Sequence, residues 1–156
     1  MAFLGSLDIV GSALSAERTR MDVTLQNISN AHTTRTEDGT PYRRQQVVFE
    51  ERELNFETAL TQAQANASGA GGAARTQTTG GVRVAEVVES DRDFLSVYDP
   101  THPDADENGY VQYPDVDTTE EMLDMMTASN AYSTNLTVLS VMKAMINKTL
   151  EAGKQA

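Results

Sequence analysis

The stretch HPDADENGYVQYPD, residues 102–115, contains the side chains whose types and spacing come closest to a chemical site. Counted from Asp104, it has carboxylate or amide groups at Asp104, Asp106 and Asn108, then Gly109, and then Asp115 at loop position twelve. This spacing nearly matches the calcium-binding loop of an EF-hand, in which side-chain oxygens surround a hard cation in a tight turn. One hypothesis is therefore a calcium-binding interaction protein that uses the acidic loop 104–115.

The residues on either side of this loop argue against an EF-hand, which has a helix before and after the loop. The segment that leads into the loop contains Pro100 and Pro103, which interrupt a helix. The segment YVQYP alternates apolar and polar residues, as a strand does. Position twelve is Asp115, which is shorter than the glutamate that usually binds calcium through both oxygens. Calcium binding is therefore the weaker of two hypotheses.

The favoured hypothesis for this stretch is a hairpin with a polar loop. The segments FLSVY (94–98) and YVQY (110–113) have the composition of strands and flank the acidic residues on both sides. The dipeptide Asn108-Gly109 is typical of hairpin turns. We therefore predict a solvated β-hairpin whose acidic spacing resembles a calcium loop by coincidence.

The rest of the sequence has no group of residues with the spacing of a catalytic, cofactor or metal site. His32 and His102 are far apart and lie beside turn-forming residues, so we expect surface or capping roles for both. There is no cysteine, no G-x-S-x-G motif, and no glycine-rich loop followed by Lys-Ser/Thr. We predict that the protein is not an enzyme and has no catalytic residue, cofactor, metal ligand or small-molecule substrate.

Charge and hydropathy exclude further classes of function. The 156 residues carry a net charge of −11, and thirteen acidic residues with a single arginine lie between Glu86 and Asp124. Such a surface repels nucleic acid and anionic lipid, so we predict neither as a partner. No apolar run approaches the roughly 20 residues of a membrane span. The N-terminus also lacks the basic and continuous apolar regions of a cleaved secretory signal.

The N-terminal segment 3–30 has the pattern of an amphipathic helix. Apolar residues recur every seven positions in one row, and an interleaved row with the same spacing has two poor members, Gly11 and Arg18, so the pattern is that of an imperfect coiled-coil seam. Asn30 is expected to end the helix, because asparagine tolerates the left-handed conformation at helix C-termini. The predicted contact residues are Leu7, Leu14, Met21, Leu25 and Ile28.

A second, longer helix of roughly 30 residues is predicted near the C-terminus from its three- and four-residue apolar spacing. Thr118 or Thr119 is expected to cap its start, and Gly153 is expected to end it. Its apolar band is broader than one partner helix would cover. The predicted contact residues are Met122, Met125, Tyr132, Leu136, Leu139, Met142, Ile146 and Leu150.

Shorter, strand-like segments lie between the helices. YRRQQVVFEE (42–51) follows a turn at Gly39, and GVRVAEVVES (81–90) alternates apolar and polar residues. The segment 61–81 is rich in small residues and is predicted to be a flexible loop.

We therefore predict an α+β fold in which long N- and C-terminal helices pair as a coiled coil, with a small middle region rich in β-hairpins. The predicted regions are an N-terminal helix at 1–33, a β-rich region at 34–117 and a C-terminal helix at 118–156. Two long helices without a third cannot complete a compact bundle, so other molecules must cover their remaining apolar surface. The termini are thus predicted to serve assembly.

Five segments together resemble a known protein family. LQNISNAHT (25–33) is similar to the Asn-x-x-Asn-x-x-Thr signature of bacterial flagellar rod and hook proteins. The other four segments follow in the family's order: DGTPYRRQQVVFEE (38–51), GVRVAEVVES (81–90), VYDPTHPDADENGYVQYPDVD (97–117) and the helix at 120–151. The chain resembles the proximal-rod type of this family. The matching motif residues are Asn27, Asn30, Tyr42, Arg43, Arg44, Tyr98, Asp99, Pro100, His102, Pro103, Asp104, Gly109 and Tyr110.

The resemblance implies a structural subunit of the flagellar basal body, in the rod that crosses the periplasm. It implies terminal helices that pair in an inner tube, a β-containing region outside, and a drive shaft that transmits torque by packing. The implied partners are the chain itself, other proximal and distal rod subunits, the rod-to-export-gate adaptor and the flagellar export apparatus. Passage through that apparatus without cleavage would account for the missing signal peptide.

Overall fold

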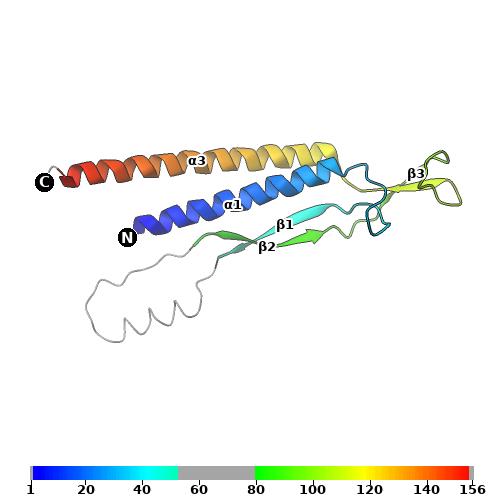
Figure 1. Cartoon of the computed structure of the whole chain (residues 1–156), viewed down its shortest axis with the longest axis horizontal. Coiled ribbons are helices and arrows are strands. Elements are labelled where there is room, and N and C mark those ends of the chain that lie inside the picture. Colours follow the sequence, from blue (N-terminus) through cyan, green and yellow to red (C-terminus); the bar gives the residue numbers. More distant parts are fainter. Residues whose placement is uncertain (1, 53–79, 155–156) are drawn as a thin grey trace, which may run out of the picture. The chain divides into compact units, whose positions relative to one another are not determined.

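The computed structural model describes residues 2–52 and 80–154, and Figure 1 shows their order along the chain. The described residues form two helices and two two-stranded sheets, which confirms the α+β class. The predicted loop at 61–81 falls, except for Gly80 and Gly81, outside the described residues. The elements are α1 (Ala2–Ser29), β1 (Gln45–Glu51), β2 (Val82–Glu89), β3 (Leu95–Tyr98), β4 (Tyr110–Tyr113) and α3 (Thr118–Lys154).

The chain divides into two compact units. One comprises Met1–Ala16, Phe49–Arg83 and Tyr132–Ala156, and the other comprises Glu17–Val48 and Val84–Ala131. The second unit contains nearly all of the well-buried side chains among the described residues, four of which are polar or charged. Its interior therefore depends on hydrogen bonds and ion pairs as well as on apolar packing.

α1 ends where the sequence predicted, but the predicted conformation of Asn30 is not observed. The helix ends at Ser29, and the side-chain amide of Asn30 donates a hydrogen bond to the Gln26 carbonyl oxygen at 3.0 Å. No residue other than glycine has a positive φ among the described residues. The expected left-handed conformation of Asn30 is therefore wrong, and its side-chain amide instead adds a second hydrogen bond to a carbonyl that already accepts the Asn30 backbone amide.

Both predicted ends of α3 need correction. Asp117, rather than Thr118 or Thr119, caps the start, because its Oδ1 accepts a hydrogen bond from the Thr119 amide at 2.8 Å. The helix runs for 37 residues to Lys154 and passes through Gly153, which lacks the positive φ of a helix-ending glycine.

The two sheets are antiparallel pairs. Two backbone hydrogen bonds flank the β1–β2 pair, one just beyond each end of the strands. The Ser90 amide donates to the Arg44 carbonyl, and the Arg52 amide donates to the Gly81 carbonyl. Seven residues of β1 lie opposite eight of β2, so β2 contains one extra residue, as in a β-bulge.

The second pair confirms the predicted hairpin around the acidic loop. In β3–β4, Leu95 lies opposite Tyr113 and Tyr98 opposite Tyr110. The tight turn is placed one residue earlier than expected, because the Gly109 amide donates to the Asp106 carbonyl at 3.0 Å. Glu107 and Asn108 are therefore its central residues. Gly109 follows with a φ of 81°, a conformation that favours glycine.

Candidate functional site

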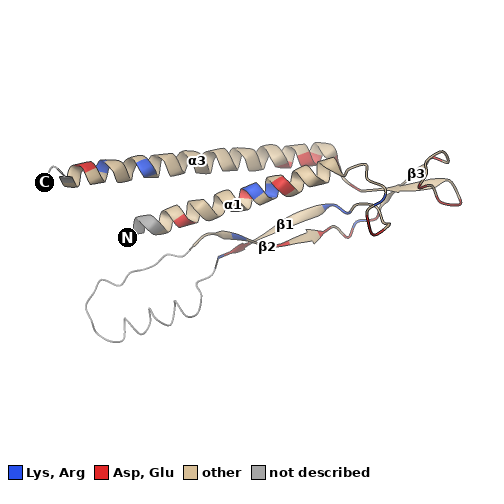
Figure 2. Cartoon of the chain, viewed as in Figure 1, with Lys and Arg blue, Asp and Glu red and all other residues tan. Residues whose placement is uncertain are grey.

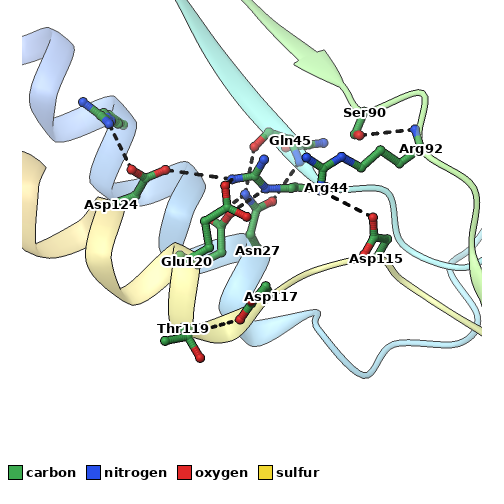
Figure 3. Close-up of polar contacts among 12 residues, drawn as sticks. Asn27, Arg44, Gln45, Ser90, Arg92, Asp115, Asp117, Thr119, Glu120 and Asp124 are labelled. Carbon is green, nitrogen blue, oxygen red and sulfur yellow. Dashed lines mark hydrogen bonds and ion pairs between the residues drawn. The ribbon is translucent and has the colours of Figure 1, made fainter.

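Asn27 is the centre of a largely buried polar cluster in the second unit, which we define as Asn27, Tyr42, Arg44, Gln45 and Glu121. Figure 3 labels three of its members, Asn27, Arg44 and Gln45. Asn27 Oδ1 accepts hydrogen bonds from the Tyr42 hydroxyl at 2.8 Å and from the Gln45 amide at 2.9 Å. Its Nδ2 donates to the Gln45 carbonyl at 2.8 Å and to Glu121 Oε2 at 2.9 Å. All four hydrogen-bonding positions of this amide are therefore occupied, and neither aspartate nor leucine could make the same set of bonds.

The charged part of the polar cluster is the ion pair of Arg44 and Glu121. Arg44 Nε donates to Glu121 Oε1 at 2.6 Å, and the two side chains are only 7% and 2% exposed. With one carboxylate oxygen bonded to Arg44 and the other to Asn27, the buried charge of Glu121 is compensated on both oxygens. Such a pair ties its segments together because separating it would leave a buried charge without a partner.

The Tyr42 hydroxyl is the remaining side-chain donor of the polar cluster, and Tyr42 is itself buried. Burial, followed by the negative charges of Glu121 and Glu89, raises the pKa of the Tyr42 hydroxyl to about 12. Its phenol therefore remains protonated near neutral pH and remains the donor in the hydrogen bond to Asn27.

The residues of the polar cluster come from three segments of the chain, and each segment places a polar group on its buried side. On α1, Asn27 follows the buried Val23 by four residues, so both lie on one helical face. On α3, Glu121 precedes the buried Ala128 by seven residues and shares its face. The segment 42–45 leads into β1 and contributes its backbone to Asn27. The polar cluster thus joins the end of α1, the start of β1 and the start of α3.

More exposed contacts surround the polar cluster. Asp124 lies 3.3 Å from Arg20 Nη2 and 3.9 Å from Arg44 Nη2, and Glu120 lies 3.8 Å from Arg44 Nη2. Arg43 donates to the Ser90 carbonyl at 3.0 Å and lies 4.7 Å above the ring of Phe94. These contacts extend the connection to the chain that follows β2.

The structure brings together only part of the predicted motif residues. Asn27, Tyr42 and Arg44 meet in the polar cluster, and Asn30 lies at the end of α1. The other nine are Arg43, beside Ser90, and eight hairpin residues: Tyr98, Asp99, Pro100, His102, Pro103, Asp104, Gly109 and Tyr110.

Sequence reasoning missed Glu121 as the central charged partner. From the sequence alone, Glu121 is one of two acidic residues in the first turn, where its charge is expected only to suit the positive end of the helix dipole. A second signal was present, because Glu121 lies four residues before Met125 and eleven before Tyr132, on the predicted apolar face. A carboxylate at such a position requires a buried cation or a hydrogen-bond donor.

The carboxylates of Asp104 and Asp106 in the acidic loop form hydrogen bonds and ion pairs with other residues of the chain. Asp104 lies 3.7 Å from Arg35 and accepts a hydrogen bond from the Thr34 hydroxyl at 2.9 Å. Asp106 Oδ1 accepts from the amides of Asn108 and Tyr110, each at 2.8 Å. Nothing in these contacts supports the calcium hypothesis, and the described residues contain no group of three or more acidic or histidine side chains placed to hold a metal ion.

The histidines and the last acidic position of the loop have local roles. His102 Nδ1 accepts a hydrogen bond from the Asp104 amide at 3.1 Å, and His32 is exposed. Asp115 pairs with Arg92 at 3.5 Å, as Figure 3 also shows.

The predicted apolar contact residues all keep accessible surface in the isolated chain. Four are exposed: Leu25 (56%), Met122 (56%), Leu136 (43%) and Leu150 (61%). The other nine are half-buried: Leu7, Leu14, Met21, Ile28, Met125, Tyr132, Leu139, Met142 and Ile146. Within the part of the chain that the structure describes, no helix is long and apolar enough to cross a membrane.

Comparison with known proteins identifies the chain's relatives. Residues 107–152 match the family described as flagellar basal body rod FlgEFG protein C-terminal. The chain is 40% identical to the flagellar basal-body rod protein FlgC of Bacillus subtilis over 158 residues, which cover 99% of this chain and 100% of the relative. It is 42% identical to the protein of the same name from Salmonella typhimurium and 44% to that from Escherichia coli, with the same coverage. The chain belongs to the FlgC family of flagellar basal-body rod proteins.

Proposed function

We propose that this protein is a subunit of the proximal rod, assembling through the apolar faces of α1 and α3 into the axial shaft that transmits torque. Its family consists of structural basal-body proteins and is not known to be enzymatic, which agrees with the prediction of a structural protein. Torque transmission, the proximal position and the packing mode are the parts that we propose.

The exposed apolar side chains of the two terminal helices carry this proposal. Eight large hydrophobic residues of α3 are more than two-fifths exposed, including Met126 at 63% and Val141 at 54%. Exposed apolar surface of this extent indicates contact with other proteins, because leaving it in water costs about 25 cal/mol per Å². Pairing of α1 with α3 as a coiled coil, followed by coverage by neighbouring subunits, would remove it from water.

The polar cluster supports a mechanical role. A shaft that transmits torque must resist rotation of one segment against another under load. The cluster joins three segments through five hydrogen bonds, one of them within the Arg44–Glu121 ion pair, and each requires a particular geometry, unlike apolar packing, which tolerates sliding. We therefore propose that it fixes the base of the middle region against the ends of the helices.

Regions, partners and location follow from the same proposal. The regions 1–33 and 118–156 would form the inner tube, and 34–117 would lie outside it. We propose that the chain contacts itself, other proximal and distal rod subunits and the rod-to-export-gate adaptor. We also propose that it passes uncleaved through the flagellar export apparatus to the rod that crosses the periplasm.

A substitution on the predicted seam tests the function. Leu14→Asp should prevent incorporation into isolated basal bodies and abolish swimming, because packing the seam would bury a carboxylate among apolar residues without a compensating charge, while the protein remains expressed. The matched control is Ser15→Asp, which introduces the same side chain at the neighbouring, exposed position. Swimming and incorporation equal to wild type in the Leu14→Asp strain would contradict assembly through this face.

A further inference from the structure

Asn108 and Gly109 form the only Asn-Gly dipeptide of the sequence, and they lie in the turn of the β3–β4 hairpin. The side chain of Asn108 is exposed to water. Glycine has no Cβ to keep its backbone nitrogen away from the side chain of the preceding asparagine. The dipeptide therefore places a side-chain amide next to a backbone nitrogen that can attack it, at a position that water reaches.

This attack leads to deamidation, and water is the only other reactant. The Gly109 nitrogen forms a bond to Cγ of Asn108, its proton passes through solvent to the side-chain nitrogen, and the bond from Cγ to Nδ2 breaks to release ammonia. The cyclic succinimide then takes up water at either carbonyl group and opens to aspartate or isoaspartate. The side-chain amide is thus replaced by a carboxylate, and isoaspartate also lengthens the backbone by a methylene group.

The hairpin requires glycine at position 109. Its φ is 81°, and a Cβ there would lie 3.0 Å from Tyr98 Cε2 and 3.3 Å from Pro100 Cβ. The Gly109 carbonyl also accepts a hydrogen bond from the Asp99 amide at 2.9 Å. A larger residue would remove the reactive dipeptide but would disturb the turn, so the fold retains the glycine that makes Asn108 reactive.

Asp106 holds both reacting residues in the closed turn. Its carbonyl accepts a hydrogen bond from the Gly109 amide at 3.0 Å, and its Oδ1 accepts one from the Asn108 amide at 2.8 Å. The same Oδ1 accepts a third hydrogen bond, from the Tyr110 amide at 2.8 Å. A Gly109 nitrogen that donates to Asp106 keeps its proton, so it becomes a nucleophile only after the turn opens locally.

We propose that Asn108 is a site of spontaneous deamidation and that the Asp106 carboxylate slows the reaction by keeping the turn closed. This inference goes beyond the rod function and does not depend on it. Because the open turn is the reactive state, the rate follows the population of that state. Figure 2 shows acidic residues in the loop that joins β3 to β4, so the product adds negative charge to a segment that is already acidic.

Peptide mass spectrometry of the purified full-length chain, stored at neutral pH, measures deamidation at each asparagine. In guanidinium chloride, wild type and Asp106→Ala should react at Asn108 at equal rates, and faster there than at any other asparagine. Without denaturant, wild type should react more slowly than the denatured chain. Folded Asp106→Ala should react roughly tenfold faster than folded wild type, because it removes two hydrogen bonds from the turn.

Two further variants separate hydrogen bonding from charge. Glu107→Ala removes the neighbouring exposed carboxylate and should leave the folded-state rate at Asn108 nearly unchanged. Asp106→Asn keeps a side-chain oxygen acceptor and should stay close to wild type, which tests the proposal even where Asp106→Ala unfolds.

Each part of the proposal has its own contrary result. A folded Asp106→Ala chain that reacts no faster than wild type would overturn the protection by Asp106. An equal acceleration in Glu107→Ala, or a rate in Asp106→Asn as high as in the denatured chain, would do the same. If Asn108 reacts no faster than the other asparagines in the denatured chain, the assignment of the site is wrong. None of these results bears on incorporation into basal bodies, so the rod function is tested separately.

Discussion

Arg44 and Glu121 form an ion pair of 2.6 Å between the chain just before β1 and the first turn of α3, with both side chains almost fully removed from solvent. Arg83 and Glu50 form a pair of nearly the same length, 2.7 Å, but those side chains are 58% and 50% exposed. Length alone therefore does not distinguish the two pairs, and burial does. We therefore expect the buried Arg44–Glu121 pair to hold its two segments together and the exposed Arg83–Glu50 pair to contribute little to stability.

The first prediction compares these two pairs. Arg44→Ala should lower the free energy of unfolding by about 3–5 kcal/mol, because it leaves the Glu121 carboxylate buried without its cation. Arg83→Ala should lower it by less than about 1 kcal/mol, since both partners are hydrated. Urea denaturation of the purified chain measures both values. Equal effects of the two substitutions would show that the buried pair has no special role.

The second prediction concerns pH and Tyr42. The folded-state pKa of about 12 lies above the ordinary value of 10.0, so the protonated phenol is favoured by folding. Its contribution, of the order of 2 kcal/mol, is complete below pH 10 and is lost as pH rises through about 12. Urea denaturation at several pH values should therefore show a steeper alkaline loss of stability for wild type than for Tyr42→Phe. Parallel curves for the two proteins would contradict the burial of the phenol.

The third prediction concerns the cap of α3. A hydrogen bond from the Thr119 amide is the largest cause that lowers the pKa of Asp117 below 3.8, followed by one from the Glu120 amide. The charged form is thus favoured by folding, and the stabilisation present above pH 3.8 is lost as pH falls through the lowered pKa. Asp117→Ala should speed amide exchange at Thr119 and Glu120 at neutral pH, and Asp117→Asn should do so less, because asparagine still caps. Unchanged exchange in Asp117→Ala would rule out this cap.

The fourth prediction compares two adjacent glycines. A Cβ at Gly81, where φ is 144°, would lie 2.6 Å from Ser12 Oγ, which itself accepts a hydrogen bond from the Val82 amide and donates one to the Ile9 carbonyl. A Cβ at Gly80 would lie 3.7 Å from Ile9 Cδ1, an ordinary contact. Gly81→Ala should therefore lower the free energy of unfolding by roughly 1–3 kcal/mol, which a clear fall in the thermal unfolding midpoint would show. Gly80→Ala should leave the midpoint nearly unchanged, and an equal response at both positions would exclude the clash.

Periodic patterns in the sequence were sufficient to locate the helices, the strands and the hairpin. Seven-residue spacing of apolar side chains predicted α1, three- and four-residue spacing predicted α3, and two-residue alternation predicted β2 and β4, whereas β1 and β3 were predicted from composition and neighbouring turns. Helix ends were less predictable, because the choice of cap among Asp117, Thr118 and Thr119 depends on the backbone path before the helix. Several neighbouring residues had the right chemistry, and the structure selected Asp117.

The sequence by itself thus determined the fold class, the positions of the two long helices and the residues of the family motif. Only the tertiary structure showed that Asn27, Tyr42 and Arg44 meet Glu121, which follows Arg44 by 77 positions. Hydrophobic periodicity is a local property that each segment expresses independently of the others. A buried polar contact depends on which segments come together and at what distance, so its partners are defined only when the chain has folded.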